Sequence, residues 1–332
     1  MKNNKQDKTL EDSAFVDSEN VAKVENNPSL SVGVDSDKNQ SNQQTQSNSP
    51  LEIAPRDKAV INVKTLIEAG AHFGHQSAKW NPKMLPYIFG AKNNIHIINL
   101  DLTVKFWERA KKALIDLVSQ GGEVLIVGTK QQVGPIVELE ARRCGAFYVN
   151  KRWLGGCLTN FQTIRKSIER MSKLEDFLHK AEQPDSKLKI SKKERLTLKK
   201  ELDKLKLNLE GIRNMRRVPD LVFVVDTVKE EIAVAEARKL KIPVMALIDT
   251  NSDPDIIDFP IPANDDASRT VTLLMQAVAD CISEGRALRN AVLAARELEG
   301  AKSGGAGLAN SGQRGARRGS SKQPSVEVGV NS

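Results

Sequence analysis

Apolar residues between positions 95 and 296 alternate between short β-branched runs and longer segments with helical periodicity. Strands are predicted at 95–99, 124–127, 146–149, 221–225, 243–248 and 258–261. Helices are predicted at 102–120 with Asp101 as N-cap, and at 133–144, 228–240 and 266–296. Strands that are apolar on both faces and alternate with helices are typical of a parallel sheet covered on both sides. The pattern therefore predicts a doubly wound α/β fold.

A different pattern fills the segment 160–217, which interrupts this alternation. On a first arm, apolar residues recur every three or four positions, at Ile164, Ile168, Met171, Leu174 and Leu178. On a second arm they follow a heptad spacing, at Leu198, Leu202, Leu205, Leu209 and Ile212. The proline-containing stretch 183–186 predicts a turn, and Ser191 with Glu194 predicts a capping box. We therefore expect an antiparallel coiled-coil helical hairpin that reaches about 30 Å from the sheet.

The two ends of the chain have the composition of disordered segments. Residues 1–56 are rich in Asn, Gln, Ser and Asp and contain a single aromatic, Phe15, so they cannot bury enough apolar area to offset their ordering entropy. Residues 301–332 are rich in Gly, Ser and Ala and contain several arginines. We predict a disordered extension at 1–56, one α/β domain at 57–300 with the hairpin inserted at 160–217, and a flexible basic tail at 301–332.

Positive charge is concentrated on the hairpin. Residues 160–217 contain seventeen Lys and Arg against nine Asp and Glu, and residues 57–159 contain fourteen against eight. Residues 218–300, in contrast, contain eight against fifteen. A polyphosphate partner selects such a local excess, because each neutralised phosphate releases condensed counterions. A solvated, Lys-rich coiled-coil face would have the same composition, so charge alone leaves both interpretations open.

Cysteine usage and hydropathy indicate a soluble protein of a reducing compartment. The three cysteines form no CxxC motif, so reduced and packed thiols are expected. No apolar run approaches the roughly 18 residues that a membrane span needs. The N-terminus also lacks the pattern of a signal or transit peptide. We therefore expect a cytoplasmic protein without a membrane partner.

Aspartates follow two of the predicted strands, at Asp226 and at Asp249 and Asp253. Ligands bind at the carboxyl ends of the strands in doubly wound sheets, so these residues could form a magnesium or phosphoryl-transfer site. Helix capping and turn formation explain the same residues and are more common. The stretch 128–130, Gly-Thr-Lys, resembles a phosphate loop, but the complete GxxxxGKS/T and GxGxxG motifs are absent. A nucleotide- or magnesium-dependent phosphohydrolase on a Rossmann-like fold is therefore the alternative hypothesis.

Two histidines, His72 and His75, lie three residues apart. A zinc site would need two more strong ligands, and no cysteine is close in sequence. Packed or hydrogen-bonded histidines are the simpler explanation, so we expect neither a metal nor a cofactor. A site that pairs His75 with Asp249 or Asp265 across the fold stays open at this point.

Two short stretches combine cations with an aromatic residue. The first, 79–83, contains Lys79, Trp80 and Lys83 and is expected in a turn. The second, 150–156, contains Arg152 and Trp153 at a strand end just before the hairpin. Arg and Lys bind phosphate oxygens, while Trp stacks on an unpaired base or packs beneath the loop. Together with the charge of the hairpin, these stretches favour RNA as the partner.

Ordered motifs along the chain resemble a known family. They are Ala69–Gln76, Trp80–Met84, Tyr87–Gly90, Asn94–Leu100, Val127–Lys130, Arg152–Gly156, Leu158–Asn160, Pro219–Asp220, Asp249–Pro254 and Ile261–Ala267. From about 63 to 289 the chain resembles the bacterial type of small-subunit ribosomal protein number two. The resemblance implies a flavodoxin-like domain with a protruding coiled coil, bound to small-subunit ribosomal RNA between head and body. It also implies recruitment of the subunit's largest protein, number one, and no catalytic activity; both terminal segments are longer than the family needs.

This interpretation predicts which residues contact RNA. On the loops they are Lys79, Trp80, Lys83, Lys92, Lys130, Arg152 and Trp153. On the hairpin they are Arg165, Lys166, Arg170, Arg213, Arg216 and Arg217. Most contacts are expected to reach the phosphate and sugar backbone, so that specificity comes from RNA shape. The expected partners are small-subunit ribosomal RNA and neighbouring ribosomal proteins, with no small-molecule substrate.

Overall fold

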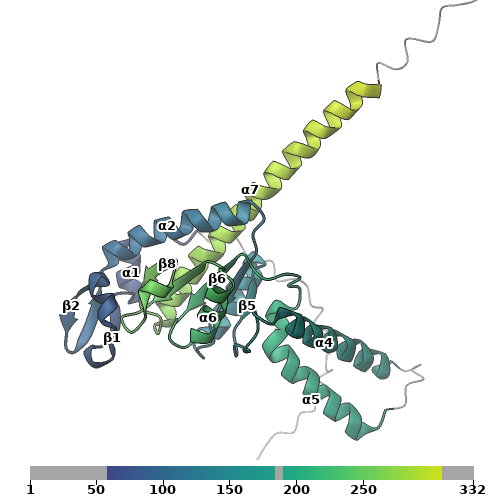
Figure 1. Cartoon of the computed structure of the whole chain (residues 1–332), viewed down its shortest axis with the longest axis horizontal. Coiled ribbons are helices and arrows are strands. Elements are labelled where there is room, and N and C mark those ends of the chain that lie inside the picture. Colours follow the sequence, from purple (N-terminus) through teal and green to yellow (C-terminus); the bar gives the residue numbers. More distant parts are fainter. Residues whose placement is uncertain (1–57, 184–189, 309–332) are drawn as a thin grey trace, which may run out of the picture. The chain divides into compact units, whose positions relative to one another are not determined.

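A five-stranded parallel sheet forms the centre of the computed structural model, which describes residues 58–183 and 190–308, the last twelve by backbone alone (Figure 1). Its strands are β4 (Val124–Val127), β5 (Phe147–Val149), β6 (Leu221–Val225), β7 (Val244–Ile248) and β8 (Phe259–Pro262). They are arranged in the order β5-β4-β6-β7-β8. Counted within the sheet, this is the order 2-1-3-4-5 of flavodoxin-like folds. The predicted doubly wound, flavodoxin-like α/β fold is confirmed.

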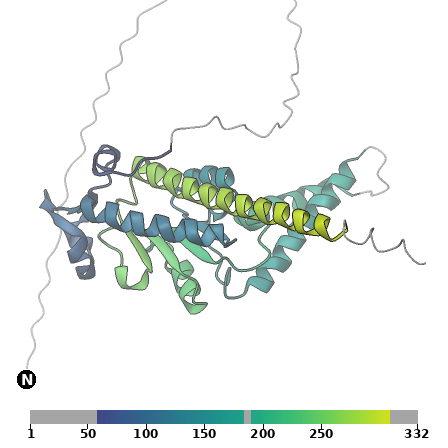
Figure 2. The same cartoon turned by 90° about the horizontal axis from the view of Figure 1, so that it is seen from above.

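Successive side chains of the strands enter two different cores. Ile126 and Phe223 pack on one face, against α1 (Val63–Ala69), α2 (Leu100–Ser119), α3 (Gly134–Cys144) and α7 (Ser268–Leu308). Leu125 and Val224 pack on the other face, which α6 (Glu231–Lys239) and the loop after β5 cover. Figure 2 shows α2 and α7 running side by side. Because side chains alternate along a strand, burial of both faces requires the continuous apolar runs seen in the sequence.

A second, antiparallel sheet had not been predicted. It contains β1 (Phe73–Gln76), β2 (Ile88–Lys92) and β3 (Ile95–Ile98) in the order β1-β3-β2. The strand predicted at 95–99 exists, but assigning it to the parallel sheet was wrong. Asn93 and Asn94 join β2 to β3 with φ angles of 51° and 58°, as a tight two-residue hairpin requires. The short helices η1 (Ser77–Lys79), η2 (Pro82–Tyr87) and η4 (Pro254–Ile256) complete the connections.

Side chains near the starts of α2 and α6 move these helices away from their predicted first residues: α2 begins earlier in the chain and α6 later. Asn99, not Asp101, caps α2, and its side chain accepts a hydrogen bond of 3.1 Å from the backbone N–H of Asp101. Before α6, the Asp226 carboxylate accepts bonds of 3.0 Å from the N–H groups of Val228 and Lys229. This turn delays the helix to Glu231.

The last helix, α7, ends later than predicted and extends to Leu308, into the predicted tail. No proline follows residue 268 within the helix, so the ladder of backbone hydrogen bonds is not interrupted. Residues 1–57 and 309–332 lie outside the described part of the chain, so the limits 57–300 of the domain stay a prediction. None of the described helices combines the length and apolar character that a membrane crossing requires.

Two helices, α4 (Phe161–Glu182) and α5 (Lys192–Leu209), occupy the predicted arms of the hairpin. The buried residues of the predicted seam are Ile164, Ile168, Met171, Leu178, Leu202, Leu209 and Ile212. Arg170 pairs with Glu201 across the two arms, and Ser191 caps α5 by accepting a bond from the Glu194 N–H. The predicted turn falls largely at 184–189, outside the described residues, so the coiled-coil geometry stays a prediction.

Candidate functional site

A lysine and three carboxylates meet beyond the carboxyl ends of the parallel strands. Lys130 follows β4, Asp226 follows β6, and Asp265 and Asp266 follow β8. The Lys130 ammonium nitrogen lies 2.8 Å from Asp226, 2.8 Å from Asp265 and 2.7 Å from Asp266. This position, between β4 and β6, is the switch point of the sheet, where flavodoxin-like folds bind ligands. Since three carboxylates surround Lys130, its positive charge is balanced by theirs within the protein.

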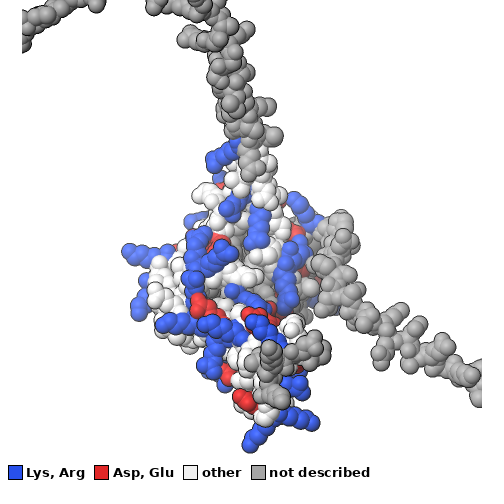
Figure 3. Space-filling model, turned by 90° about the vertical axis from the view of Figure 1, so that its right-hand side faces the viewer, with Lys and Arg blue, Asp and Glu red and all other residues white. Residues whose placement is uncertain are grey.

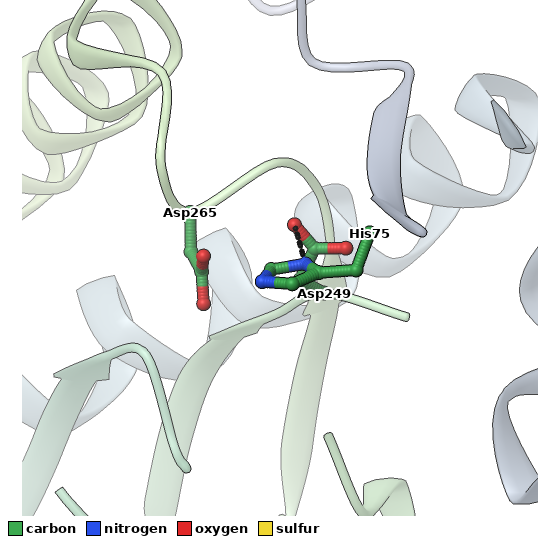
Figure 4. A group of neighbouring side chains, drawn as sticks. All are labelled: His75, Asp249 and Asp265. Carbon is green, nitrogen blue, oxygen red and sulfur yellow. Dashed lines mark ion pairs between the residues drawn. The ribbon is translucent and has the colours of Figure 1, made fainter. Parts of the chain in front are cut away.

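Beside this lysine, the structure brings His75, Asp249 and Asp265 together, with one ligand atom from each within 4.8 Å of the others (Figure 4). His75 Nδ1 lies 3.1 Å from Asp249 Oδ2. Asp265 is fully buried, and its Oδ2 has no hydrogen-bond partner among the described residues. One imidazole and two carboxylates are a donor set that suits a divalent cation such as zinc. The residues therefore fit the metal site that the sequence had left open.

The protonation states of these groups depend on one another. Burial and the charges of Asp249 and Asp226 raise the pKa of Asp265 to about 7. The hydrogen bond with Asp249 raises the pKa of His75, although burial acts in the opposite direction. Burial alone would lower the pKa of Lys130, but the surrounding carboxylates outweigh it and raise this pKa. Lys130 therefore keeps its charge, while Asp265 gains a proton as the pH falls through about 7.

The hydrogen bonds of residues 128–130 contradict their interpretation as a phosphate loop. The backbone N–H and the hydroxyl of Thr129 both donate to the carboxylate of Glu230. The donors that a phosphate loop would offer to a nucleotide are thus taken by the protein's own carboxylates. Asp253, the third residue of the phosphohydrolase hypothesis, pairs with Lys83 at 2.8 Å instead of joining the cluster.

The predicted RNA-binding cations fall into two groups. One group is exposed and forms no ion pair with another described residue: Lys79, Lys92, Arg152, Lys166 and Arg216. The other group is engaged by carboxylates: Lys83, Lys130, Arg165, Arg170, Arg213 and Arg217. A cation of the second group must leave a protein partner before it binds a phosphate. The first group is therefore the better candidate for contact with RNA.

Arg217, which is predicted to contact RNA, pairs with a carboxylate of its own chain. Its two terminal nitrogens donate to the two carboxylate oxygens of Asp220, each at 2.8 Å. Asp220 also accepts a bond of 2.8 Å from the backbone N–H of Glu123. This arrangement connects the end of the helical insertion to the chain that enters β4.

The two tryptophans of the cationic stretches differ in their surroundings. Trp153 is only 8% exposed, and its indole N–H donates to Glu236 at 3.1 Å. Its ring packs inside the protein, and its contact with RNA stays a prediction. Trp80 is half-buried, and its ring centre lies 5.1 Å from that of His96.

The sequence did not reveal two features, one on the surface and one buried. Lys193, Lys200 and Lys204 are exposed on α5, and their spacing of seven and four residues places them on one face. The heptad spacing of the seam could have revealed that this face points away from α4. The second feature is Glu236, an acidic residue between the buried Ala233 and Ala237 of α6.

Figure 3 shows a face of the molecule on which Lys and Arg cover more surface than Asp and Glu.

An apolar groove lies where α1 meets the small sheet. It has a volume of about 290 Å³, and its lining includes Val63, Ile67, Phe89 and Ile97. Phe89 is 77% exposed and Ile67 51% exposed. Exposed apolar patches mark contacts with other proteins, with membranes or with ligands.

Known proteins resemble this chain over most of its length. Residues 66–285 match the family described as ribosomal protein S2. Proteins named small ribosomal subunit protein uS2 are among the relatives. The one from Lawsonia intracellularis is 52% identical over 231 residues, which cover 70% of this chain and 78% of the relative. The one from Petrotoga mobilis is 51% identical over 228 residues (69% and 78%), and the one from Oleidesulfovibrio alaskensis 48% over 244 residues (74% and 92%).

Proposed function

Since this chain belongs to the ribosomal protein S2 family and is a structural protein of the small ribosomal subunit, not an enzyme, we propose that it binds ribosomal RNA there. The binding site lies between head and body of the subunit. The exposed cations that have no carboxylate partner among the described residues provide the contacts. A second part of the proposal is that the protein helps to recruit the subunit's largest protein, number one.

The distribution of unpaired cations is the observation that carries the RNA part. Lys79 and Lys92 belong to the small sheet and its connections, Arg152 to the loop before α4, and Lys200 and Lys204 to the outer face of α5. These side chains are exposed and have no ion pair among the described residues, so they can meet phosphates without losing one. Contacts of this kind read the backbone and therefore the shape of a folded RNA.

Charge reversal on α5 tests this part. The double variant Lys200→Glu and Lys204→Glu should weaken binding of the full-length protein to small-subunit ribosomal RNA. If both lysines contact phosphates, the slope of log affinity against log salt should fall by about 1.4–1.8 in magnitude. A filter-binding titration at several salt concentrations measures both quantities.

A matched control separates specific contacts from net charge. Lys105 and Lys112 are exposed on α2, and reversing both changes the net charge by the same amount. The control should keep most of the affinity and the salt slope. Equal losses in the two double variants would show that α5 is not the RNA-binding face.

The apolar groove supports the second part, because it offers a protein partner a preformed site. Phe89 is the most exposed large apolar side chain of the described residues, so its removal should not disturb the fold. The variant Phe89→Ala should lower the amount of protein number one in purified small subunits, while the amount of this protein itself stays unchanged. Quantitative mass spectrometry of the subunits measures both amounts.

Leu85 provides the control for the groove, since it is 64% exposed but does not line it. The variant Leu85→Ala should leave the content of protein number one unchanged. Normal content in Phe89→Ala subunits would contradict recruitment through this groove.

A further inference from the structure

The loop between β5 and α4 is built around one carboxylate. Glu236 of α6 accepts a bond of 3.1 Å from the indole of Trp153 and one of 2.7 Å from the N–H of Gly156. It also accepts bonds from the N–H of Leu158 at 2.9 Å, and from the N–H and the hydroxyl of Thr159, both at 3.0 Å. Glu236 is 8% exposed, and no cation of the described residues forms an ion pair with it. Neutral donors alone therefore satisfy this carboxylate.

Backbone N–H groups that converge on one point form an anion-binding nest, and here the protein supplies the anion. Gly156 has a φ of 85°, a conformation that side chains other than Gly rarely adopt. Burial alone would raise the pKa of Glu236, but the hydrogen bonds from Thr159, Leu158 and Gly156 outweigh it and lower this pKa. The carboxylate is thus ionised, and its bonds are of the stronger, charge-assisted kind.

The loop connects the sheet to the helical insertion. Arg152, one of the unpaired cations, directly precedes Trp153, and Asn160 is the N-cap of α4. We propose that Glu236 is an internal anion that holds residues 153–159 in one conformation, and thereby positions Arg152 and the start of α4 relative to the sheet. Glu236 is a positioning residue and has no contact with RNA itself. The proposal holds whether or not the protein binds RNA through these elements.

The positioning role of Glu236 is tested by removing its carboxylate and then supplying a carboxylate in solution. Glu236→Ala leaves the donors unsatisfied, and formate supplies a carboxylate small enough for the vacated space. Glu231→Ala is the control, because Glu231 is exposed on the same helix. Hydrogen exchange of the full-length protein, followed by mass spectrometry, compares peptides of 153–160 with peptides of β4 and β6. Glu236→Ala should accelerate exchange in 153–160 at least about tenfold, and formate should slow it again.

A second measurement reports on the position of α4. Spin labels at Lys180→Cys on α4 and Lys105→Cys on α2 give a distance distribution by pulsed electron resonance. The native Cys144, Cys157 and Cys281 are buried, and burial raises the pKa of each thiol, so they resist labelling. The distribution should broaden in Glu236→Ala and narrow again with formate, but stay unchanged in Glu231→Ala.

The outcomes separate positioning from a general loss of stability. Faster exchange confined to 153–160, with a broader distance distribution and reversal of both by formate, supports the proposal. Unchanged exchange or an unchanged distribution would overturn it. An increase shared by β4 and β6 that formate does not reverse would overturn it too, because Glu236 would then stabilise the whole domain.

Discussion

Gly211 determines how closely the end of the helical insertion approaches the parallel sheet. It lies in the short helix η3 (Glu210–Ile212), next to the edge strand β5. A Cβ atom at this position would stand closer to the Tyr148 carbonyl oxygen than real Cβ atoms do, and 2.6 Å from Tyr148 Cδ2. The obstructing oxygen belongs to the backbone, so a change of rotamer cannot move it away. The variant Gly211→Ala must therefore shift η3 away from β5.

The magnitude follows from two opposing effects. Replacing Gly by Ala in a helical segment stabilises by about 0.5–1 kcal/mol, because the unfolded chain loses conformational freedom. Overpacking costs about 1–3 kcal/mol, and a collision with backbone belongs at the upper end of that range. We therefore expect Gly211→Ala to lower the free energy of unfolding by about 2 kcal/mol. For a domain of this size, that corresponds to a midpoint of thermal unfolding lower by about 4–8 °C.

Gly90 provides the matched control, because a Cβ built on it meets nothing within 4 Å. The variant Gly90→Ala should not lower the free energy of unfolding, and should raise it by up to about 1 kcal/mol. Urea unfolding followed by circular dichroism, together with thermal unfolding, measures both variants against the parent protein. Equal stability of Gly211→Ala and Gly90→Ala would refute the close contact between η3 and β5.

Two further predictions concern ion pairs. Burial opposes ionisation of Asp220, but its bonds with Arg217 and the Glu123 N–H outweigh burial and hold its pKa below the usual value. The ionised carboxylate therefore stabilises the fold at pH 7, and this contribution is lost as the pH falls through the lowered pKa. In urea unfolding at pH 7, the variant Asp220→Asn should be less stable than the parent protein. This difference in stability should shrink below about pH 4. A difference that stays constant with pH would show that the ion pair does not cause it. The variant Lys130→Met leaves the carboxylates of Asp226 and Asp265 without their cation. It should lower the free energy of unfolding by about 3–5 kcal/mol in the same assay, whereas a loss below about 1 kcal/mol would contradict the buried network.

The parallel sheet could be predicted because its three central strands are buried on both faces. Strands β4, β6 and β7 are apolar at every position, which gives them an unambiguous signal. The small sheet has no such pattern: Phe73, Phe89 and Ile95 are exposed, while His96 and Gly90 interrupt the apolar runs of their strands. Its register depends on the Asn93–Asn94 turn and on contacts with the parallel sheet, which no local pattern contains.

The candidate site could be predicted in its residue types but not in its pairings. Aspartates at the carboxyl ends of strands indicated that Asp226 and Asp249 would lie at one edge of the sheet. The sequence could not show that Lys130 would pair with Asp226 and Asp265, because residue 130 and Asp265 are 135 positions apart in the chain. Asp253 illustrates the opposite error, since it follows the same strand as Asp249 but turns to Lys83.

The same limit applies to the cations, and it explains why the α5 face was missed. The hairpin's excess of Lys and Arg does not tell which of them remain unpaired. Glu201 lies one helical turn before Lys204 and could have paired with it, but Arg170 of the other arm takes this carboxylate. Glu175 likewise binds Arg213. Cations near the contact between the arms are therefore neutralised by the arms' own acids. Among the described residues, the hairpin cations left for a partner include Lys166 on α4 and Lys200 and Lys204 on the outer face of α5.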